Sequence, residues 1–186
     1  MTHERTLSED QALVGSLLAA RGFGDFRWLD PTQVVVSEWV RMKCRFGCDN
    51  YGRFATCPPN VPDVAECRAF FREYSLAAML RSERVEPDHA ARRRWSNEMV
   101  REMVALERDV FLAGYERAFA LPFATCHLCA ECTARREECK LPYEARPTPE
   151  SLAVDVFATA RSVGYPIEVV TALDQTQNRY GMLLVR

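Results

Sequence analysis

Four stretches of the chain repeat their apolar residues with the spacing of an amphipathic helix. The first has a Ser8–Gln11 capping box at its start and Gly22 at its end. The longest places Met99 and Met103 four residues apart on one face. With their start and stop signals, these patterns predict helices over residues 8–22, 62–74, 87–121 and 148–164.

Four other stretches are rich in apolar, β-branched or aromatic residues, which is typical of strands. They cover residues 34–42, 76–80, 167–173 and 180–185, and DQTQNR is expected to connect the last two as a hairpin. Helices and strands together predict an α+β fold, with a mainly antiparallel sheet and helices packed on it. We expect a single metal-binding domain over residues 1–186, interrupted by two cysteine-rich loops at 44–62 and 124–147.

Composition narrows the class of protein. Of 186 residues, 48% are hydrophobic and 27% are charged, as in globular domains. No apolar run is long enough for a membrane span, and the polar start MTHERTLSEDQ does not resemble a signal peptide. The net charge of −2 argues against a nucleic-acid partner. We therefore expect a cytoplasmic protein without a membrane partner, whose oligomeric state the sequence leaves open.

Cysteine is the residue type that points to a function. Without an export signal, cysteines are expected to be reduced thiols that are free, metal-bound or catalytic, and a disulfide framework is not expected. The eight cysteines fall into two groups, which are Cys44, Cys48, Cys57 and Cys67 and then Cys126, Cys129, Cys132 and Cys139.

The second group has the spacing C-x2-C-x2-C, and six residues separate Cys132 from Cys139. Three thiolates this close suit three corners of a cubane iron–sulfur cluster, and Cys139 can take the fourth. Ferredoxin motifs end in Cys-Pro, whereas Lys140 follows Cys139, so the match to them is partial. Zinc is the alternative, although zinc sites usually use two C-x2-C pairs set further apart. His127 lies between two of the cysteines and is interpreted as a solvent-facing bystander.

The first group has the spacing Cys44-x3-Cys48-x8-Cys57. Three interpretations stay open. These cysteines hold a second cluster with Cys67 as fourth ligand, or they hold a cluster whose fourth iron is open to a small ligand. Alternatively, Cys57 completes the other cluster and leaves Cys139 free. Cys67 lies on the apolar helical face of Val64 and Phe71, and we interpret it as a core residue.

These motifs resemble a known family. WVRMKCRFGCDNYGRFATCPPNVP, LAGYERAFAL, CHLCAEC, ARPTPES, DVFATARSVG and YGMLLVR are similar to the predicted metal-binding proteins classed as domain of unknown function 2284. The resemblance covers nearly the whole chain. It implies a cytoplasmic metal-binding or iron–sulfur protein without an assigned reaction, whose ligands are Cys44, Cys48, Cys57, Cys126, Cys129, Cys132 and Cys139. The family usually reads E-A-x-G-I-D-V over residues 150–156, where Ala153 here replaces the glycine.

Three functions follow as hypotheses. The first is a protein that carries one or two [4Fe–4S] clusters and passes electrons to a redox partner protein. The second is an enzyme that uses an open, three-cysteine cluster as a Lewis acid or sulfur-binding centre. The third is a zinc-stabilised binding module.

Two further features of the sequence bear on function. The basic run Arg92–Arg94 beside Trp95 is interpreted as a solvated helix face rather than a docking patch. Asp155, among apolar helix residues, is open to a role as an acid or base, a helix cap or an ion-pair partner. Phosphate-binding and dinucleotide-binding glycine motifs are absent from the sequence.

Overall fold

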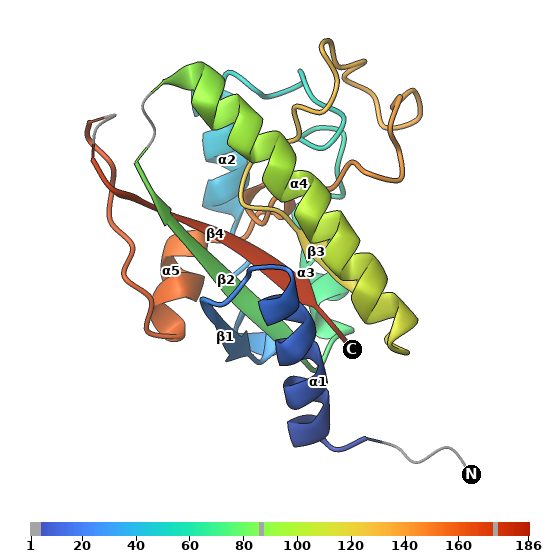
Figure 1. Cartoon of the computed structure of the whole chain (residues 1–186). Helices are drawn as coiled ribbons and strands as arrows, with labels where there is room; N and C mark the ends of the chain where they lie inside the picture. Colours follow the sequence, from blue (N-terminus) through green and yellow to red (C-terminus); the bar gives the residue numbers. More distant parts are fainter. Residues whose placement is uncertain (1–4, 86–87, 173–174) are drawn as a thin grey trace.

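The computed structural model describes residues 5–85, 88–172 and 175–186. Its centre is a four-stranded antiparallel sheet in the order β1-β2-β4-β3 (Figure 1). The strands are β1 Phe26–Leu29, β2 Ala77–Arg84, β3 Phe119–Leu121 and β4 Gln177–Leu184. The predicted α+β class is confirmed.

Helices cover both faces of this sheet (Figure 1). Two of them, α1 Leu7–Ala20 and α4 His89–Leu112, pack on one face. On the other face, α3 Val64–Arg72 and α5 Val156–Ser162 contribute to the core. The remaining helical elements are α2 Glu38–Gly47 and the short 3-10 helices η1 Pro31–Gln33 and η2 Glu150–Leu152. Within the described residues, no helix is long and apolar enough to cross a membrane.

The central strands are apolar at consecutive positions because both of their faces are buried. In β2, Ala77 and Met79 belong to the core under α3 and α5, whereas Ala78 and Leu80 belong to the core under α1 and α4. The side chains of a strand alternate between faces, so a strand covered on both sides needs an apolar residue at every position. This explains why residues 76–80 were readily predicted as a strand.

The strand predicted over residues 34–42 is wrong. The structure has only an isolated bridge from Val36 to Val154, and helix α2 begins directly after Ser37. The β-branched run that suggested a strand is confined to three valines, and the residues after Ser37 have helical periodicity, with Val40 buried. The first cysteine therefore lies on a helix rather than at the end of a strand.

The helix predicted over residues 148–164 is divided in two. Ala153 has φ +60°, in the left-handed region, and ends η2 there. The helix restarts at α5 because Asp155 caps it, accepting a hydrogen bond from the Ala158 backbone N–H. This division matters for the site, since it turns the residues of η2 toward the cysteines. The positive φ at Gly164 confirms the predicted helix end.

Other boundaries also differ from the predictions. The first helix is capped by a Thr6–Glu9 box instead of Ser8–Gln11. Helix α4 ends at Leu112, earlier than predicted, and the chain continues into β3. Neither β3 nor β1 is predicted by the sequence patterns. Residues 167–172 form no strand, so the predicted hairpin does not form; Leu173 and Asp174 lie outside the described residues. Strand β4 pairs instead with β2 and β3. Strands β1 and β3, of four and three residues, are too short to show a clear alternation of apolar and polar residues.

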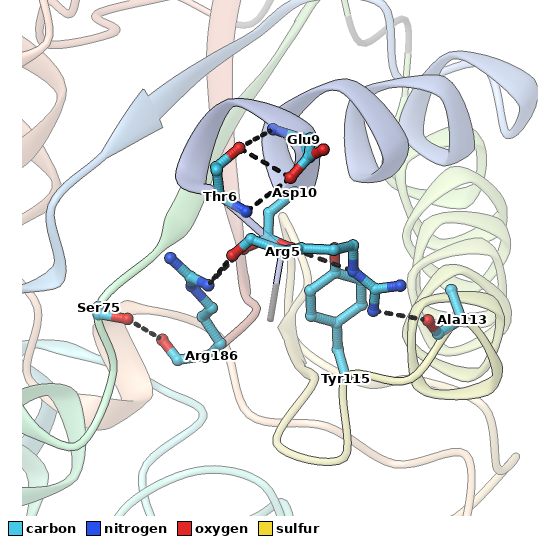
Figure 2. Close-up of polar contacts among 8 residues, drawn as sticks. All are labelled: Arg5, Thr6, Glu9, Asp10, Ser75, Ala113, Tyr115 and Arg186. Atoms are coloured by element: carbon cyan, nitrogen blue, oxygen red, sulfur yellow. Dashed lines mark hydrogen bonds and ion pairs between the residues drawn. The ribbon is translucent and has the colours of Figure 1, made fainter. Parts of the chain in front are cut away.

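The first helix is fixed to the C-terminal end by a buried carboxylate (Figure 2). Asp10 is 1% exposed and accepts a hydrogen bond from the hydroxyl of Tyr115 at 2.6 Å. It also forms ion pairs with Arg5 and Arg186. Three partners compensate the cost of burying this charge, and they connect residues from both ends of the chain.

Candidate metal centre

The two cysteine-rich loops lie side by side next to the N-terminal half of α4 (Figure 1). Helix α4 holds the second loop at two points. Ser96 donates a hydrogen bond to the Thr125 carbonyl at 2.8 Å, and Arg93 donates to the carbonyls of Cys129 and Ala130 at 3.3 and 3.4 Å. The long helix thus serves as a support for a segment that has no regular structure of its own.

All four cysteines of the second loop line one small cavity. We call Cys126, Cys129, Cys132 and Cys139 the four-cysteine site. Each of these side chains is partly buried. The cavity has a volume of about 20 Å³, and its remaining walls include Leu128, Leu141 and Ala145. The predicted ligands of this loop are therefore brought together around one enclosed space.

The first cysteine-rich loop forms the opposite wall of this cavity. Phe54, Ala55 and Thr56 line it, and the Ala55 backbone N–H donates a hydrogen bond to the sulfur of Cys132 at 3.4 Å. The ring of Phe54 packs edge-on against His127, with ring centroids 4.7 Å apart. N–H donors aimed at cysteine sulfur stabilise the thiolate form, which is the form that binds metals.

The pKa of Cys126 is influenced by the other three thiols of this site. Burial raises the pKa of the Cys126 thiol, a hydrogen bond from the Leu128 backbone lowers it, and negative charge on Cys139, Cys129 and Cys132 raises it further. Four neighbouring thiols cannot all ionise to thiolates without a compensating cation. A bound metal centre supplies that positive charge, so this donor set fits a thiolate-ligated metal.

Cys44, Cys48 and Cys57 form a second, separate group, which we call the three-cysteine site. Cys44 lies in the last turn of α2, Cys48 caps that helix, and Cys57 is buried in the loop that follows. They line a cavity of about 150 Å³ together with residues of η2. Cys57 therefore lies with Cys44 and Cys48, and not in the cavity of the four-cysteine site.

Arg41 holds the two sides of the three-cysteine site together. Its guanidinium extends from α2 and donates hydrogen bonds to the carbonyls of Pro62 and Ser151, each at 3.1 Å. Ser151 belongs to η2 and its hydroxyl lies 4.0 Å from the sulfur of Cys57. One side chain thus connects the helix that carries Cys44 to the element that contacts Cys57.

Cys57 is the most strongly perturbed of the cysteines. Burial raises the pKa of its thiol to about 11, although hydrogen bonds from the side chains of Ser151 and Thr125 lower it and negative charge on Cys48 and Cys44 raises it. Burial also raises the pKa of Cys44, the charge of Cys48 adds to this, and Arg41 opposes it. The pKa of Cys57 thus depends on the charges of Cys44 and Cys48.

The three-cysteine cavity adjoins two larger cavities, and Cys48 and Arg92 line all three. One, of about 500 Å³, has polar walls that include His89, Arg93 and His127; we call it the polar cavity. The other, of about 610 Å³, lies along α2 and is lined mainly by apolar side chains; we call it the apolar cavity. The three-cysteine site is thus accessible from two sides, in contrast to the four-cysteine site.

The structure places the remaining candidates as follows. Cys67 is 1% exposed within the core under α3, as expected for an apolar core residue. His127 does not face solvent freely: it is half-buried, and it lines the polar cavity rather than the cavity of the four thiols. Asp155 is a helix cap. Of the basic run, Arg93 binds the second loop and Arg92 lines the cavities, so this run is more than a solvated face.

Several residues of the site were missed by sequence reasoning. Thr125, Glu150, Ser151 and Arg179 line the three-cysteine cavity, and two of them are hydrogen-bonded to Cys57. The segment ARPTPES carries two of these residues and contributed to the family resemblance, which was the one signal available. Arg179 lies on β4, more than 100 positions from Cys44, Cys48 and Cys57, and only the fold brings it near them.

As the side chains stand, no three cysteine, histidine, aspartate or glutamate residues within the described ranges converge closely enough to hold one metal ion. None of the eight cysteines, all of which are described, forms a disulfide. The seven candidate sulfurs share two cavities without converging on one point in either. A metal bound at the four-cysteine site would require the surrounding loop to adjust, and that loop has no helix or strand to prevent it.

Comparison with known proteins supports the same chemistry. No curated protein and no solved structure matches the chain. A family model, described as a predicted metal-binding protein, matches residues 27–185, which include all of the cysteines. The chain therefore belongs to the DUF2284 family of predicted metal-binding proteins.

Proposed function

We propose that this chain is an iron–sulfur protein with one [4Fe–4S] cubane at the four-cysteine site and a second at the three-cysteine site. We further propose that it exchanges single electrons with a partner protein in the cytoplasm. The observation that carries the proposal is the division of seven cysteines between two neighbouring cavities. Reduced cysteines of this kind require a reducing compartment, which supports a cytoplasmic location.

The arrangement of the sulfurs favours a cluster over a single zinc ion. Four thiolates on one zinc ion stand about 3.8 Å apart, since each Zn–S bond is about 2.3 Å. A cubane binds each thiolate at a different iron, so its ligands surround a shared space without converging. Cys126, Cys129, Cys132 and Cys139 lie around one shared cavity, which supports a cubane there. His127, the nitrogen ligand that zinc would favour, lines a different cavity.

When bound, the clusters would store and release single electrons. The chain itself would hold them and set their potential. The Ala55 N–H at Cys132 and the hydroxyl groups of Ser151 and Thr125 at Cys57 are donors to ligand sulfur. Such donors favour the more negative, reduced state of a cluster and so raise its reduction potential.

Two features support electron transfer to a partner. The loop segment that contains Ala55 and Cys57 contributes to both cavities, so two peptide bonds and the hydrogen bond from Ala55 to the Cys132 sulfur give a short path between the sites. On α2, next to Cys44 and Cys48, the side chains of Trp39, Met42 and Phe46 are 48%, 50% and 74% exposed. Exposed apolar residues in one stripe are typical of a docking surface for another protein.

A second candidate function rests on a different observation, the openness of the three-cysteine site. Only three cysteines line its cavity, and two larger cavities adjoin it. A cluster held by three thiolates leaves one iron without a protein sulfur, and such an iron acts as a Lewis acid or binds sulfur. A spectroscopic change of the cluster upon addition of a small ligand would favour this enzyme over electron transfer alone.

Anaerobic purification followed by iron, acid-labile sulfide and zinc analysis tests the proposal. We expect a brown protein with two cubanes per chain. The variants Cys132→Ser and Cys48→Ser should each lose about half of the iron, because each removes a ligand from one site only. Cys67→Ala is the matched control, and its iron content should equal that of the wild type.

Three outcomes would contradict the proposal. A colourless protein that contains only zinc would support the zinc-stabilised module. An iron content of one cubane, lost in Cys132→Ser and kept in Cys48→Ser, would remove the second cluster. Loss of a cluster in Cys67→Ala would show that the residue we place in the core is a ligand.

A further inference from the structure

The three-cysteine site lacks a fourth thiol. Cys44, Cys48 and Cys57 are the only cysteines that line its cavity of about 150 Å³ in the part of the chain that the structure describes. Cys67, which the sequence offers as a fourth ligand, is 1% exposed in the core, and its sulfur lies 3.6 Å from the Pro62 carbonyl oxygen. A cubane binds one ligand at each iron, so a fourth protein ligand would have to be another type of residue.

Glu150 is a residue of a suitable type in this cavity. Among the described residues that line it, Glu150 carries the only carboxylate, and none is a histidine. His89, His127 and Asp49 line the polar cavity instead, and Glu168 lines the apolar cavity. Carboxylates are established anionic ligands of iron in proteins, whereas the hydroxyl and amide oxygens of the cavity wall are neutral.

The fold places Glu150 close to the cysteines. It is the first residue of η2, and the next residue, Ser151, is the one whose hydroxyl lies near the sulfur of Cys57. The hydrogen bond from Arg41 to the Ser151 carbonyl holds η2 against α2, the helix that carries Cys44. Burial raises the pKa of the Cys44 thiol, and the negative charge of Glu150 is among the influences that raise it further. The carboxylate of Glu150 therefore acts on one of the three thiols directly.

The existing partners of Glu150 leave room for a metal ion. Although the side chain is exposed, neighbouring protein atoms displace water from its carboxyl and raise its pKa. Hydrogen bonds from its own backbone and from the Thr148 side chain, and the positive charge of Arg179, lower that pKa. A carboxylate has two oxygens that each accept more than one bond, so these partners do not exhaust it. Groups that contact a ligating carboxylate in this way also orient it.

We propose that the Glu150 carboxylate is the fourth ligand of the cluster at the three-cysteine site, bound to the iron that no cysteine holds. The inference rests on the proposed function, because it requires a cluster there. Thiolates bind cluster iron more strongly than carboxylates do, so Glu150 is the ligand that an incoming small molecule would displace. The two larger cavities that adjoin the site give such a molecule access to it.

Titration of the full-length, anaerobically purified protein with methyl isocyanide tests the inference. This probe is a neutral ligand of iron, so the removal of a charge from the site does not by itself attract or repel it. Electron paramagnetic resonance of the reduced clusters detects its binding to an iron that has no cysteine. In Glu150→Gln no carboxylate has to be displaced, and we expect binding at least about tenfold tighter than in the wild type. A ligand bound in about nine of ten molecules lowers the apparent affinity by that factor.

Two other carboxylates provide matched controls. Asp49→Asn removes the carboxylate that follows Cys48 in the chain, and Glu168→Gln removes one from the wall of the apolar cavity. Both variants should bind methyl isocyanide like the wild type. Glu150→Asp keeps the charge and withdraws the carboxylate by one methylene, so its affinity should lie between those of the wild type and Glu150→Gln. All four variants should keep the iron and sulfide of the wild type, because the three thiolates remain.

Equal isocyanide affinity in the wild type and Glu150→Gln, or no binding to either, would overturn the inference. Tightening in Asp49→Asn equal to that in Glu150→Gln would overturn it as well, since it would reveal a general effect of charge. Iron analysis separates these failures from failure of the proposed function. If Cys48→Ser loses about half of the iron and Glu150→Gln binds like the wild type, only the role of Glu150 is rejected. If Cys48→Ser keeps all the iron, no cluster lies at this site and both proposals are rejected.

Discussion

The two cysteine sites differ in how their ligands are supplied and how they are enclosed. The four-cysteine site takes all its thiols from 14 consecutive residues, 126–139, and encloses a cavity of about 20 Å³. The three-cysteine site combines the end of a helix, a loop and η2, and its cavity of about 150 Å³ adjoins two larger ones. A complete, enclosed thiol set suits electron storage, whereas an incomplete, accessible set suits contact with a ligand or partner.

The surrounding backbone differs as well. Loop 49–62 contains hydrogen bonds from the backbone N–H groups of Tyr51, Gly52, Arg53, Cys57 and Asn60 to carbonyls nearby. The longer loop 124–147 has only those donated by Cys139, Glu144 and Ala145. The three-cysteine site is therefore largely organised by the protein itself. The four-cysteine site depends more on whatever its thiols bind.

Removal of the metal should show this difference most strongly. We expect amides 126–139 to lose nearly all protection when a chelator removes the proposed metal, because few backbone hydrogen bonds hold this loop. The local stability should fall by several kcal/mol. Amides 50–60 should change less, and those of β2 and β4 should not change. Hydrogen–deuterium exchange with peptide resolution measures all three regions, and equal loss of protection in both loops would refute the distinction.

Arg41→Ala should affect one site and spare the other. The variant loses two hydrogen bonds from a charged donor to the carbonyls of Pro62 and Ser151, so we expect a loss of about 2–4 kcal/mol in the free energy of unfolding. Metal bound at the three-cysteine site should fall, while that at the four-cysteine site is retained. Denaturant unfolding and metal analysis give the two values.

Arg45→Ala is the matched control on the same helix. Arg45 is exposed and lies over the ring of Phe46, so its removal should cost less than about 0.5 kcal/mol. Equal losses in the two arginine variants would show that Arg41 has no special role in joining α2 to η2.

Ser151→Ala should change the electronic properties of the three-cysteine site more than the fold. Loss of the hydroxyl donor near Cys57 would remove about 1 kcal/mol of stabilisation from the reduced state of the proposed cluster, so its reduction potential should fall. Spectroelectrochemical titration measures it. Ser16→Ala, on the exposed side of α1, should leave both potentials unchanged, and an equal shift in that control would contradict the assignment.

Ala153→Gly tests the left-handed backbone turn that ends η2. A non-glycine residue with φ +60° costs about 1–2 kcal/mol, which offsets the loss of a buried methyl group. We expect the free energy of unfolding to change by less than about 1 kcal/mol. Ala160→Gly, equally buried but inside α5, should cost about 2 kcal/mol, and thermal unfolding of both variants measures the difference. Equal costs would argue against a strained turn.

The predictions from sequence succeeded where the signal is local. Cysteines three residues apart necessarily lie close together, so the grouping around Cys129 followed from spacing alone. Helix α3 and strand β2 also have clear patterns, because one face or both faces are buried. The run 34–42 failed because three valines favoured a strand, whereas Ser37 and the periodicity after it favoured α2.

The remaining features depend on contacts between distant segments. Ser151 and Arg41 are ordinary polar residues in the sequence, and their roles arise because η2 packs beside α2. The left-handed turn at Ala153 could not be inferred from an alanine, since alanine strongly favours a right-handed helix. The three-cysteine and apolar cavities likewise follow from the fold, because they form between segments that the sequence separates by more than 100 positions.

The hydrogen bond from the Ala55 N–H to the Cys132 sulfur connects the two sites. Binding of a cofactor at one site can therefore affect binding at the other. A cofactor inserted at either site restrains the same short stretch of chain, which is part of both binding surfaces. If that restraint makes the second insertion easier, thermodynamic reciprocity requires the first to benefit equally from the second. Loading of the two proposed clusters would then be cooperative, and chains with one cluster would be scarce at intermediate supplies of iron.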